Sequence, residues 1–329
     1  MLVKSQHLNP KLFLDSIEHL PNRKGFGDGL VEAGQNDSAV MGLCADVTGS
    51  VQMAAFAKEF PERYIEVGVA EQNMVTIAAG LAAVGKVPFA ASYAAFSPGR
   101  NWEQIRTTIC LNERPVKIVG AHAGLSVGAD GATHQMLEDI ALMRVLPNMT
   151  VVVPCDVHEA RKATLALAKT KTPAYLRLAR EKTPVVTTEK TPFAIGQANL
   201  IQEGKDVSVI VCGPLLYEAL LAAKELAADG VSAEVINCAT IKPLDKKSIL
   251  TSVEKTGAVV TVEEAQIAGG LGGTIAELLA FHHPAPIGQV GIKDRFGQSG
   301  TVSELWDEYG LSAPHIADVI SQTIKRKAF

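Results

Sequence analysis

The segment His122–Gln135 holds the densest group of side chains that could do chemistry. His122, Asp130 and His134 lie in this glycine-rich segment, which follows a predicted strand. Ligands of open parallel sheets bind at the carboxyl ends of strands, and His122 marks such an end. Imidazole and carboxylate groups there can bind phosphate or sugar hydroxyls and act as acid or base near neutral pH. For any one of these residues, an incidental place on a surface loop is the alternative.

Glu71 begins a predicted helix whose next residues, Met74–Ala83, are small or apolar on every face. A helix that is apolar all round is typically buried, so we expect Glu71 to be shielded from solvent. A shielded carboxylate requires a proton or a dedicated partner. The alternative is a partly hydrated acid in a first helical turn, where the helix dipole favours it.

Aromatic and guanidinium side chains lie near the ends of other predicted elements. Tyr93 and Phe96 follow a strand and could belong to the core or form a platform for a flat heteroaromatic ring. Arg23 and Arg180 lie where a guanidinium group can hold phosphate through two hydrogen bonds. Each arginine alone could equally be a solvated surface residue.

Two glycine motifs are rejected as nucleotide or metal sites. Gly269–Thr274 leads from a strand into a helix, but a GxGxxG fingerprint requires glycine at the position of Ile275. A tight turn is the better interpretation. Gly27–Gly29 matches the start of the magnesium–diphosphate motif of thiamine enzymes, but it runs into a predicted helix and lacks the asparagine that should follow. We therefore predict no metal site in this chain.

The elements that would position these residues alternate between strands and helices, which predicts a mainly parallel sheet covered on both faces. In the first half, strands are predicted at 39–44, 63–67, 87–93, 116–121, 150–153 and 174–178, with helices at 29–34, 71–83, 102–111, 135–145 and 157–168. After a predicted linker at 181–192, strands are expected at 207–212, 233–237, 258–262 and 288–291, with helices at 217–228, 246–254, 274–280 and 313–325. The predicted fold class is α/β, with two three-layer α/β domains at residues 1–187 and 188–329, the second smaller.

Composition is typical of a packed soluble protein, with 329 residues, 47% hydrophobic and 20% charged. A net charge of -4 argues against a nucleic-acid partner. Five scattered cysteines without a CxxC pair predict buried thiols in a reducing compartment. We predict no signal sequence, and the apolar region 76–96 is broken by glycine, lysine and proline. A membrane span is therefore not expected, and the cytoplasm is the expected location.

Ordered motifs along nearly the whole chain resemble the C-terminal half of a transketolase, in the branch of that family whose enzyme is split over two genes. In chain order the motifs are Arg23, Ala45-Asp46 with Ser50, Gly68-Val69-Ala70-Glu71, Tyr93 with Phe96, His122 with Asp130 and His134, and Leu178-Ala179-Arg180-Glu181. The resemblance implies a pyrimidine-binding thiamine-diphosphate domain followed by a transketolase C-terminal domain. It also implies transfer of a two-carbon ketol unit from a ketose phosphate to an aldose phosphate.

The resemblance further implies roles for single residues. Glu71 matches the acid that hydrogen-bonds the aminopyrimidine ring of thiamine diphosphate, and Tyr93 and Phe96 match aromatics that pack against this ring. Asp46 matches a residue beside the cofactor. His122 matches a sugar-hydroxyl ligand near the reacting carbons, so Glu71 and His122 are the implied catalytic residues. A second sugar-hydroxyl ligand is Asp130, and the matches at the substrate-phosphate end are Arg23, Ser50, His134 and Arg180.

The chain departs from the family at Tyr93, where phenylalanine is usual, and at Gly99-Arg100, where a further aromatic residue is usual. Without a magnesium–diphosphate motif of its own, the chain would need an N-terminal subunit to hold the diphosphate and Mg²⁺, and would be inactive alone. The expected assembly has two copies of each chain, and a self-dimer is also expected. The cofactor hypothesis requires Glu71 to be shielded from bulk water and not held by a lysine of its own subunit.

Three alternatives remain open. Deoxyxylulose phosphate synthase shares the loop Gly128–Gly131 almost as written, but it lacks a histidine that matches His122. The β-subunit of a 2-oxo acid dehydrogenase has a glutamate that matches Glu71, but it would not need the phosphate-facing residues. A non-catalytic scaffold or regulatory subunit would be expected to have lost the residues of the site.

Overall fold

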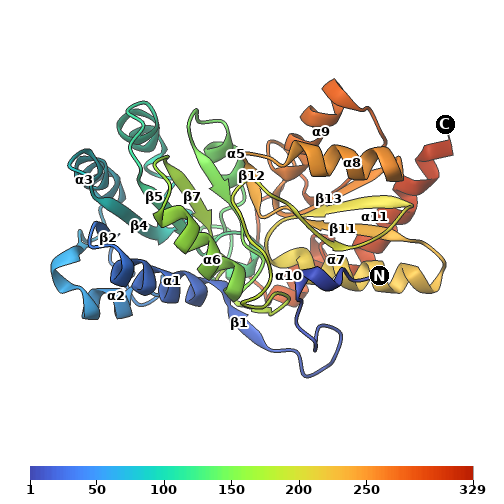
Figure 1. Cartoon of the computed structure of the whole chain (residues 1–329), viewed down its shortest axis with the longest axis horizontal. Coiled ribbons are helices and arrows are strands. Elements are labelled where there is room, and N and C mark those ends of the chain that lie inside the picture. Colours follow the sequence, from blue (N-terminus) through green and yellow to red (C-terminus); the bar gives the residue numbers. More distant parts are fainter. Residues whose placement is uncertain (329) are drawn as a thin grey trace.

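The structure, a computed structural model, describes residues 1–328 and contains two helix-covered sheets. In Figure 1 the blue-to-green half of the chain lies on one side and the yellow-to-red half on the other. Both sheets are mostly parallel, so the predicted α/β class with two domains is confirmed.

The first sheet has seven strands in the order β12-β6-β7-β5-β4-β2-β3. All neighbours pair in parallel except β12, which is antiparallel to β6. Near-continuous apolar runs form these strands because helices cover both faces. The bounds are β2 Val40–Cys44, β3 Tyr64–Glu66, β4 Val87–Tyr93, β5 Lys117–Ala121, β6 Thr150–Val152, β7 Ala174–Arg177 and β12 Thr240–Lys242.

The helices of the first domain lie on both faces of this sheet (Figure 1). They are α1 Asn22–Asn36, α2 Ala54–Glu59, α3 Glu71–Ala83, α4 Trp102–Gln104, α5 Asp139–Arg144 and α6 Val157–Ala168, with the π-helix η3 Ile105–Cys110 and the short helices η1 Lys4–Gln6, η2 Pro61–Arg63 and η4 Leu125–Asp130. Gly25 lets α1 approach α6 closely, because a Cβ atom there would lie 1.9 Å from the Val157 carbonyl oxygen.

The second sheet has five strands in the order β14-β13-β10-β11-β9, in which only β9 is antiparallel to its neighbour. Its strands are β9 Asn199–Gln202, β10 Val207–Val211, β11 Ala233–Asn237, β13 Val259–Gln266 and β14 Ile287–Ile292. The helices of this half are α7 Leu216–Ala228, α8 Lys246–Thr256, α9 Leu271–His282, α10 Val302–Glu308 and α11 Ala313–Lys325, with η5 Gly213–Leu215 and η6 Arg326–Ala328.

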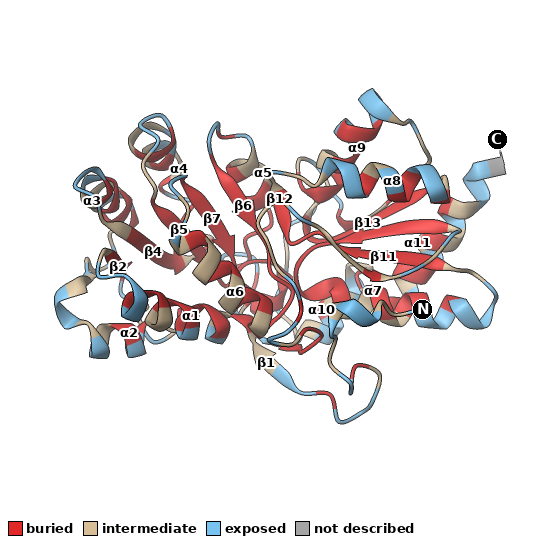
Figure 2. Ribbon diagram, viewed as in Figure 1, coloured by how far each residue is buried: buried red, intermediate tan, exposed pale blue. Residues whose placement is uncertain are grey.

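Contacts between the two domains are extensive. Strand β12 comes from the second half of the chain but extends the first sheet, and one apolar cluster combines Leu43 and Val151 with Ile210 and Val259. Burial in Figure 2 is accordingly continuous from one sheet to the other. The start of the chain in turn contacts the second sheet, where Val3 N–H donates to the Ile201 carbonyl of β9 at 2.9 Å.

The segment 181–192, predicted as a linker, is ordered. Strands β1 (His19–Pro21) and β8 (Lys182–Pro184) pair antiparallel. The buried Asp156 carboxylate then accepts hydrogen bonds from the Val186 and Thr187 N–H groups at 2.9 and 2.6 Å. The domain boundary at residue 187 remains a prediction.

Several sequence predictions of secondary structure require correction. The helix expected at 29–34 is α1, which begins seven residues earlier and ends two residues later. The helix expected at 135–145 begins only at Asp139, because Met136 forms a bridge with Ala123 and the Gln135 side chain donates to Leu125 and Gln298 carbonyls. Helix α3 is not buried all round, since it packs on the sheet through one face only. Its exposed residues are Gln72, Asn73, Gly80 and Ala83. Strands β1, β8, β9 and β12 and helices α2 and α10 were missed; all are short, and β12 also pairs outside its own half of the chain.

Other local predictions are confirmed. All five cysteines are buried free thiols. Gly269 has a φ of 78° and Gly270 precedes the first residue of α9, so the glycine-rich stretch is a turn into a helix. Gly27–Gly29 lies in the middle of α1, where Asp28 pairs with Lys24 one turn away. Among the helices described, none is both long and apolar enough to cross a membrane.

Candidate active site

Most of the residues singled out in the sequence meet at the carboxyl ends of four neighbouring strands, β2, β4, β5 and β7. The register pairs Tyr93, the last residue of β4, with Ala121, the last residue of β5, so His122 follows directly beside Tyr93. Arg180 follows the end of β7, which is paired with β5. The parallel sheet therefore brings together residues from distant parts of the sequence, as predicted.

The four rings of Tyr93, Phe96, His122 and His134 form one surface, here called the aromatic wall. The Tyr93 and His122 rings stack with centroids 3.9 Å apart, and the Tyr93 and Phe96 rings stack at 6.1 Å. His134 meets Phe96 edge-on at 5.5 Å. Tyr93 and Phe96 are only partly buried, so the wall offers exposed ring surface to a flat ligand.

His122 is the most constrained residue of the wall. It is 2% exposed, and its backbone has a φ of 55°, which residues other than glycine rarely adopt. Among residues 1–328, its buried Nδ1 has no hydrogen-bond partner, whereas Nε2 lies 3.5 Å from Arg23 Nη1. Desolvation lowers the pKa of His122 to about 3, and the nearby charges of Arg23 and Arg180 contribute.

His122 is therefore not expected to act as an acid near neutral pH, as a histidine with the ordinary pKa could. At neutral pH its imidazole is uncharged, with one nitrogen that donates and one that accepts a hydrogen bond. It can orient a hydroxyl group, but it cannot hold an anion by charge.

Two arginines flank the aromatic wall. Arg23 Nη1 donates to the Ser50 carbonyl at 2.5 Å, while its buried Nε has no hydrogen-bond partner within the described chain. Burial lowers the pKa of Arg23, partly offset by Glu181. Arg180 Nη1 donates to the Val127 carbonyl at 2.5 Å and lies 3.4 Å from an Asp130 carboxylate oxygen. Both guanidinium groups keep donors free for an anionic ligand.

Glu71, at the first position of α3, is 2% exposed, as the sequence predicted. Its carboxylate lies 3.2 Å from Arg100 Nη1, and the Arg100 guanidinium carbon lies 5.3 Å from the centre of the Phe96 ring. The cofactor hypothesis requires that no lysine of the same subunit pairs with Glu71. The partner found is an arginine, which no sequence pattern indicated. Arg100 is half-exposed, so it links the buried acid to the edge of the aromatic wall.

Asp46 lies apart from the aromatic wall, at the end of β2 beside β3. It is exposed and has a φ of 59°, and its N–H donates to Glu66 Oε1 at 2.7 Å. Thr48 Oγ1 and Gly68 N–H also donate to the Glu66 carboxylate. Burial opposes ionisation of Glu66, but these hydrogen bonds outweigh burial and lower its pKa. Glu66, which fixes the turn before Glu71, was not identified from the sequence; its only signal was an acid at a strand end.

Glu264 is the second acid that the sequence analysis missed. It lies in β13 of the second domain, is 1% exposed, and accepts hydrogen bonds from Ser126 in the segment His122–Gln135. The signal was two consecutive glutamates, Glu263 and Glu264, at the end of an otherwise apolar strand. Charged residues are almost never fully buried without partners, so such a pair indicates a polar network.

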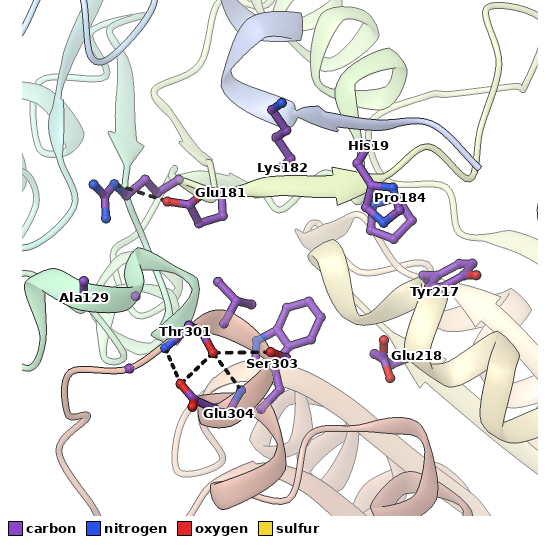
Figure 3. Close-up of a pocket in the computed structure, with 15 residues that line it drawn as sticks. His19, Ala129, Glu181, Lys182, Pro184, Tyr217, Glu218, Thr301, Ser303 and Glu304 are labelled. Atoms are coloured by element: carbon purple, nitrogen blue, oxygen red, sulfur yellow. Dashed lines mark hydrogen bonds and ion pairs between the residues drawn. The ribbon is translucent and has the colours of Figure 1, made fainter. Parts of the chain in front are cut away.

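A cavity of 930 Å³ lies between the two domains and adjoins this site through Arg180. Figure 3 shows Ala129 of the segment His122–Gln135 on one side, and Thr301 and Glu304 at the start of α10 on another. Tyr217 and Glu218 of α7 also line the cavity, as do His19, Lys182 and Pro184 of the paired strands β1 and β8. Within residues 1–328, no cluster of three or more His, Cys, Asp or Glu side chains could hold a metal ion.

Two family profiles match the chain. The transketolase pyrimidine-binding domain matches residues 18–185, and the transketolase C-terminal domain matches residues 196–316. A solved structure described as a split gene transketolase, inactive beta4 tetramer, superimposes with a TM-score of 0.88 and 42% identity, covering 94% of this chain and 99% of that one.

Curated relatives of similar length carry transketolase names. The putative transketolase C-terminal section of Methanocaldococcus jannaschii is 44% identical, covering 93% of this chain and 96% of the relative. The 6-deoxy-6-sulfo-D-fructose transketolase subunit SqwH of a Clostridium species is 40% identical, with 93% and 95% covered. A subunit of the apulose-4-phosphate transketolase of Phocaeicola vulgatus is 36% identical, with 92% and 97% covered.

Proposed function

Since this chain belongs to the transketolase family, as the C-terminal section of a split transketolase, we propose that it is the β-type subunit of a two-chain enzyme that depends on thiamine diphosphate. The reaction is transfer of a two-carbon ketol unit from a ketose phosphate to an aldose phosphate. The observation that best supports the proposal is the aromatic wall, which has a buried glutamate at one end and two arginines at the other.

The residues near Glu71 fit the aminopyrimidine ring of thiamine diphosphate. The partly exposed faces of Tyr93 and Phe96 suit a flat heteroaromatic ring, and Glu71 offers a shielded carboxylate beside them. Unpartnered buried atoms, such as Nδ1 of His122, are explained if a bound molecule supplies their hydrogen bonds. When bound, the cofactor supplies a carbon nucleophile that can cleave and form carbon–carbon bonds beside a carbonyl group.

Glu71 and Asp46 have distinct roles toward the cofactor in this proposal. Glu71 would hold its proton toward a ring nitrogen of the pyrimidine, and Arg100, whose Nη1 lies 3.2 Å from Glu71 Oε2, would compete for the same carboxylate. Asp46, which is exposed after the end of β2, would lie beside the bound cofactor. The diphosphate and Mg²⁺ are held mainly by the N-terminal subunit.

Substrate binding uses the other end of the aromatic wall. The neutral His122 orients a sugar hydroxyl near the reacting carbons, and Asp130 accepts a hydrogen bond from a second hydroxyl. The terminal phosphate is bound by the two arginines, and Ser50 and His134 make further contacts. The proposed phosphate ligands are Arg23, Ser50, His134 and Arg180.

The identity of the sugar is left open by the relatives, which are named for a sulfosugar and for apulose 4-phosphate. A sulfonate and a phosphate both present oxygens that a guanidinium group can hold. Arg23 and Arg180 therefore favour a sugar with an anionic end over an uncharged sugar.

Assembly from two kinds of chain is part of the proposal. We expect two copies of each subunit, and self-association without the partner, as in the beta4 tetramer named above. Val69 and Val84, which flank α3, are 72% and 74% exposed, and the outer face of α3 is uncovered in the single chain. Coverage of this face by a second subunit is part of the proposal. Native mass spectrometry of the chain alone and with its partner measures both assemblies. A lone chain that stays monomeric contradicts the expected self-association.

The test of the activity is reconstitution with the N-terminal subunit, thiamine diphosphate and Mg²⁺. We expect turnover of xylulose 5-phosphate with ribose 5-phosphate, or of their sulfonated analogues, little turnover of pyruvate, and none without the partner. Glu71→Ala should reduce turnover at least 100-fold, because its carboxylate is the proposed proton carrier. Preferential use of pyruvate would support a 2-oxo acid enzyme, and unchanged turnover of the Glu71 variant would support a non-catalytic subunit.

A further inference from the structure

The segment 122–135, called here the histidine loop, carries three proposed site residues, His122, Asp130 and His134. His122 and Gly124 have φ values of 55° and 83°, so the backbone follows a path that most residues disfavour. Unfavourable backbone conformations of this kind persist only where the surroundings enforce them. The loop must therefore be held by contacts from outside itself.

Some of these contacts come from the first domain, where Ala123 N–H donates to the Leu178 carbonyl and Arg180 donates to the Val127 carbonyl. The second domain supplies others, and Glu264 makes those at the centre of the loop. Its Oε1 accepts hydrogen bonds from the Ser126 N–H and from Trp306 Nε1 of α10, the latter at 3.0 Å. Its Oε2 accepts from Ser126 Oγ at 3.1 Å. Ser126 lies midway between His122 and Asp130, so one buried carboxylate fixes the centre of the loop.

The loop packs closely against Glu264. A Cβ atom at Gly124 would lie 2.6 Å from the Glu264 carboxyl carbon, so the loop backbone passes directly against this side chain. At the far end of the loop, Arg177 Nη2 donates to the backbone carbonyls of both Met136 and Glu264, at 3.3 and 2.9 Å. Leu137 is fixed by the Gln266 N–H, which donates to its carbonyl at 2.8 Å.

We infer that Glu264 is a positioning residue, through which the second domain holds His122 and Asp130 in place for the reaction. This inference rests on the proposed function, because the value of a fixed loop is the orientation of the sugar hydroxyls against the reacting carbons. It assigns the C-terminal domain a direct part in the active site, although it contributes no residue to the aromatic wall.

The neighbouring Glu263 provides a matched control. It lies on the same strand and is equally buried, but its two carboxylate oxygens accept hydrogen bonds from the Leu271 and Gly272 N–H groups at the start of α9. Loss of either acid leaves two or more buried donors unsatisfied, which destabilises the fold. Of the two carboxylates, that of Glu264 bonds to the histidine loop and that of Glu263 bonds to α9.

The experiment compares Glu264→Met, Glu264→Gln and Glu263→Met in the reconstituted two-chain enzyme. Glu264→Met should lower kcat 10- to 100-fold, and it should speed hydrogen exchange in the peptide that covers the loop at least 10-fold. Glu264→Gln should regain most of the activity, because its amide oxygen still accepts from Ser126 N–H and Trp306. Glu263→Met should keep kcat within about twofold despite a comparable fall in the midpoint of thermal unfolding.

Equal kcat in the two methionine variants, or unchanged loop exchange in Glu264→Met, overturns the inference. If Glu264→Met fails to fold, Ser126→Ala and Trp306→Phe take its place, because each removes one hydrogen bond to Glu264. Both should lower kcat and speed loop exchange, with effects three- to tenfold smaller than those expected for Glu264→Met. Failure of the wild-type enzyme to transfer a ketol unit overturns the proposed function instead, because loop exchange is measured without substrate.

Discussion

At the scale of single residues, the surroundings of His122 lower the stability of the fold but suit the proposed function. Its imidazole has lost hydration, its Nδ1 has no partner among the described residues, and it lies beside Arg23. Each of these features disfavours the protonated ring, so the folded protein holds His122 neutral far below the pH at which an unfolded chain would protonate it.

This difference predicts an acid sensitivity that is specific to His122. The folded pKa of about 3 lies below the unfolded value of about 6.5, so the unfolded chain binds the extra proton and gains stability as the pH falls between these values. Between pH 6.5 and pH 4, His122 should cost the wild-type protein about 2–3 kcal/mol of stability. His122→Asn, in which asparagine tolerates positive φ, should not show this loss. Urea unfolding across this range measures the effect. His282→Asn, an exposed control on α9, should follow the wild type.

The Glu71–Arg100 pair is the second residue-scale feature, and its two partners differ in exposure. The Glu71 side chain is 3% exposed and that of Arg100 is 52% exposed. Removing one partner of a fully buried pair costs roughly 3–5 kcal/mol, whereas an exposed pair contributes under about 1 kcal/mol. This pair should fall between those limits.

A double-mutant cycle with Arg100→Met and Glu71→Gln should therefore give a coupling free energy of about 1–2 kcal/mol in denaturant unfolding. The same cycle on the surface pair Lys24–Asp28, with both side chains about half-exposed, should give under about 0.5 kcal/mol. Equal coupling in the two cycles would mean that Glu71 is hydrated in solution, which would remove the main support for its proposed role.

The sequence was informative about which residues form the site but not about the contacts that tune them. Tyr93, His122 and Arg180 were predictable because parallel strands end at a common edge. Arg100 and Glu264 were not, because their contacts depend on side-chain packing between segments far apart in sequence. The neutral state of His122 was missed for the same reason: desolvation is a property of the folded surroundings.

At the scale of elements, close packing of α1 on α6 distinguishes two helical glycines. A Cβ atom at Gly25 would lie 1.9 Å from the Val157 carbonyl oxygen, whereas a Cβ atom at Gly80 in α3 would meet nothing within 4 Å. The first glycine is required by the helix contact, and the second only weakens its helix relative to alanine.

We therefore expect opposite effects from the same substitution. Gly80→Ala should raise the free energy of unfolding by about 0.5–1 kcal/mol, because alanine restricts the unfolded chain and favours helix. Gly25→Ala should lower it by about 2–4 kcal/mol, since α1 must move away from α6. Chemical denaturation of the two variants beside the wild type measures both. A neutral Gly25→Ala would mean that the two helices are not in close contact in solution.

Regular elements were the most predictable part of the fold, and irregular ones the least. Helix α6 was predicted to the residue, and β4 likewise, because both have clear periodicity and charged or glycine boundaries. The start of α5 was placed four residues early, since the bridge between Met136 and Ala123 is a long-range contact that local pattern does not contain. Strand β12 was missed because its partner β6 lies in the other half of the chain.

At the scale of the whole molecule, the two domains share structure and should not unfold separately. Strand β12 carries the first sheet across the domain boundary, Ile241 within it is 2% exposed, and the chain start pairs with β9. Unfolding either domain alone would expose the apolar cluster that both build. Such shared burial makes partial unfolding unfavourable.

The two tryptophans allow a direct test, because Trp102 lies in α4 of the first domain and Trp306 in α10 of the second. We expect Trp306→Phe, which leaves Trp102 as the probe, and Trp102→Phe, which leaves Trp306, to report urea transitions with the same slope and with midpoints that follow far-UV circular dichroism. Adding Ile241→Ala to each should lower both midpoints together, since removal of this buried side chain costs about 2–4 kcal/mol wherever the probe lies. A midpoint that shifts for one tryptophan only would show that β12 belongs energetically to a single domain, and would separate the histidine loop from the support that Glu264 provides.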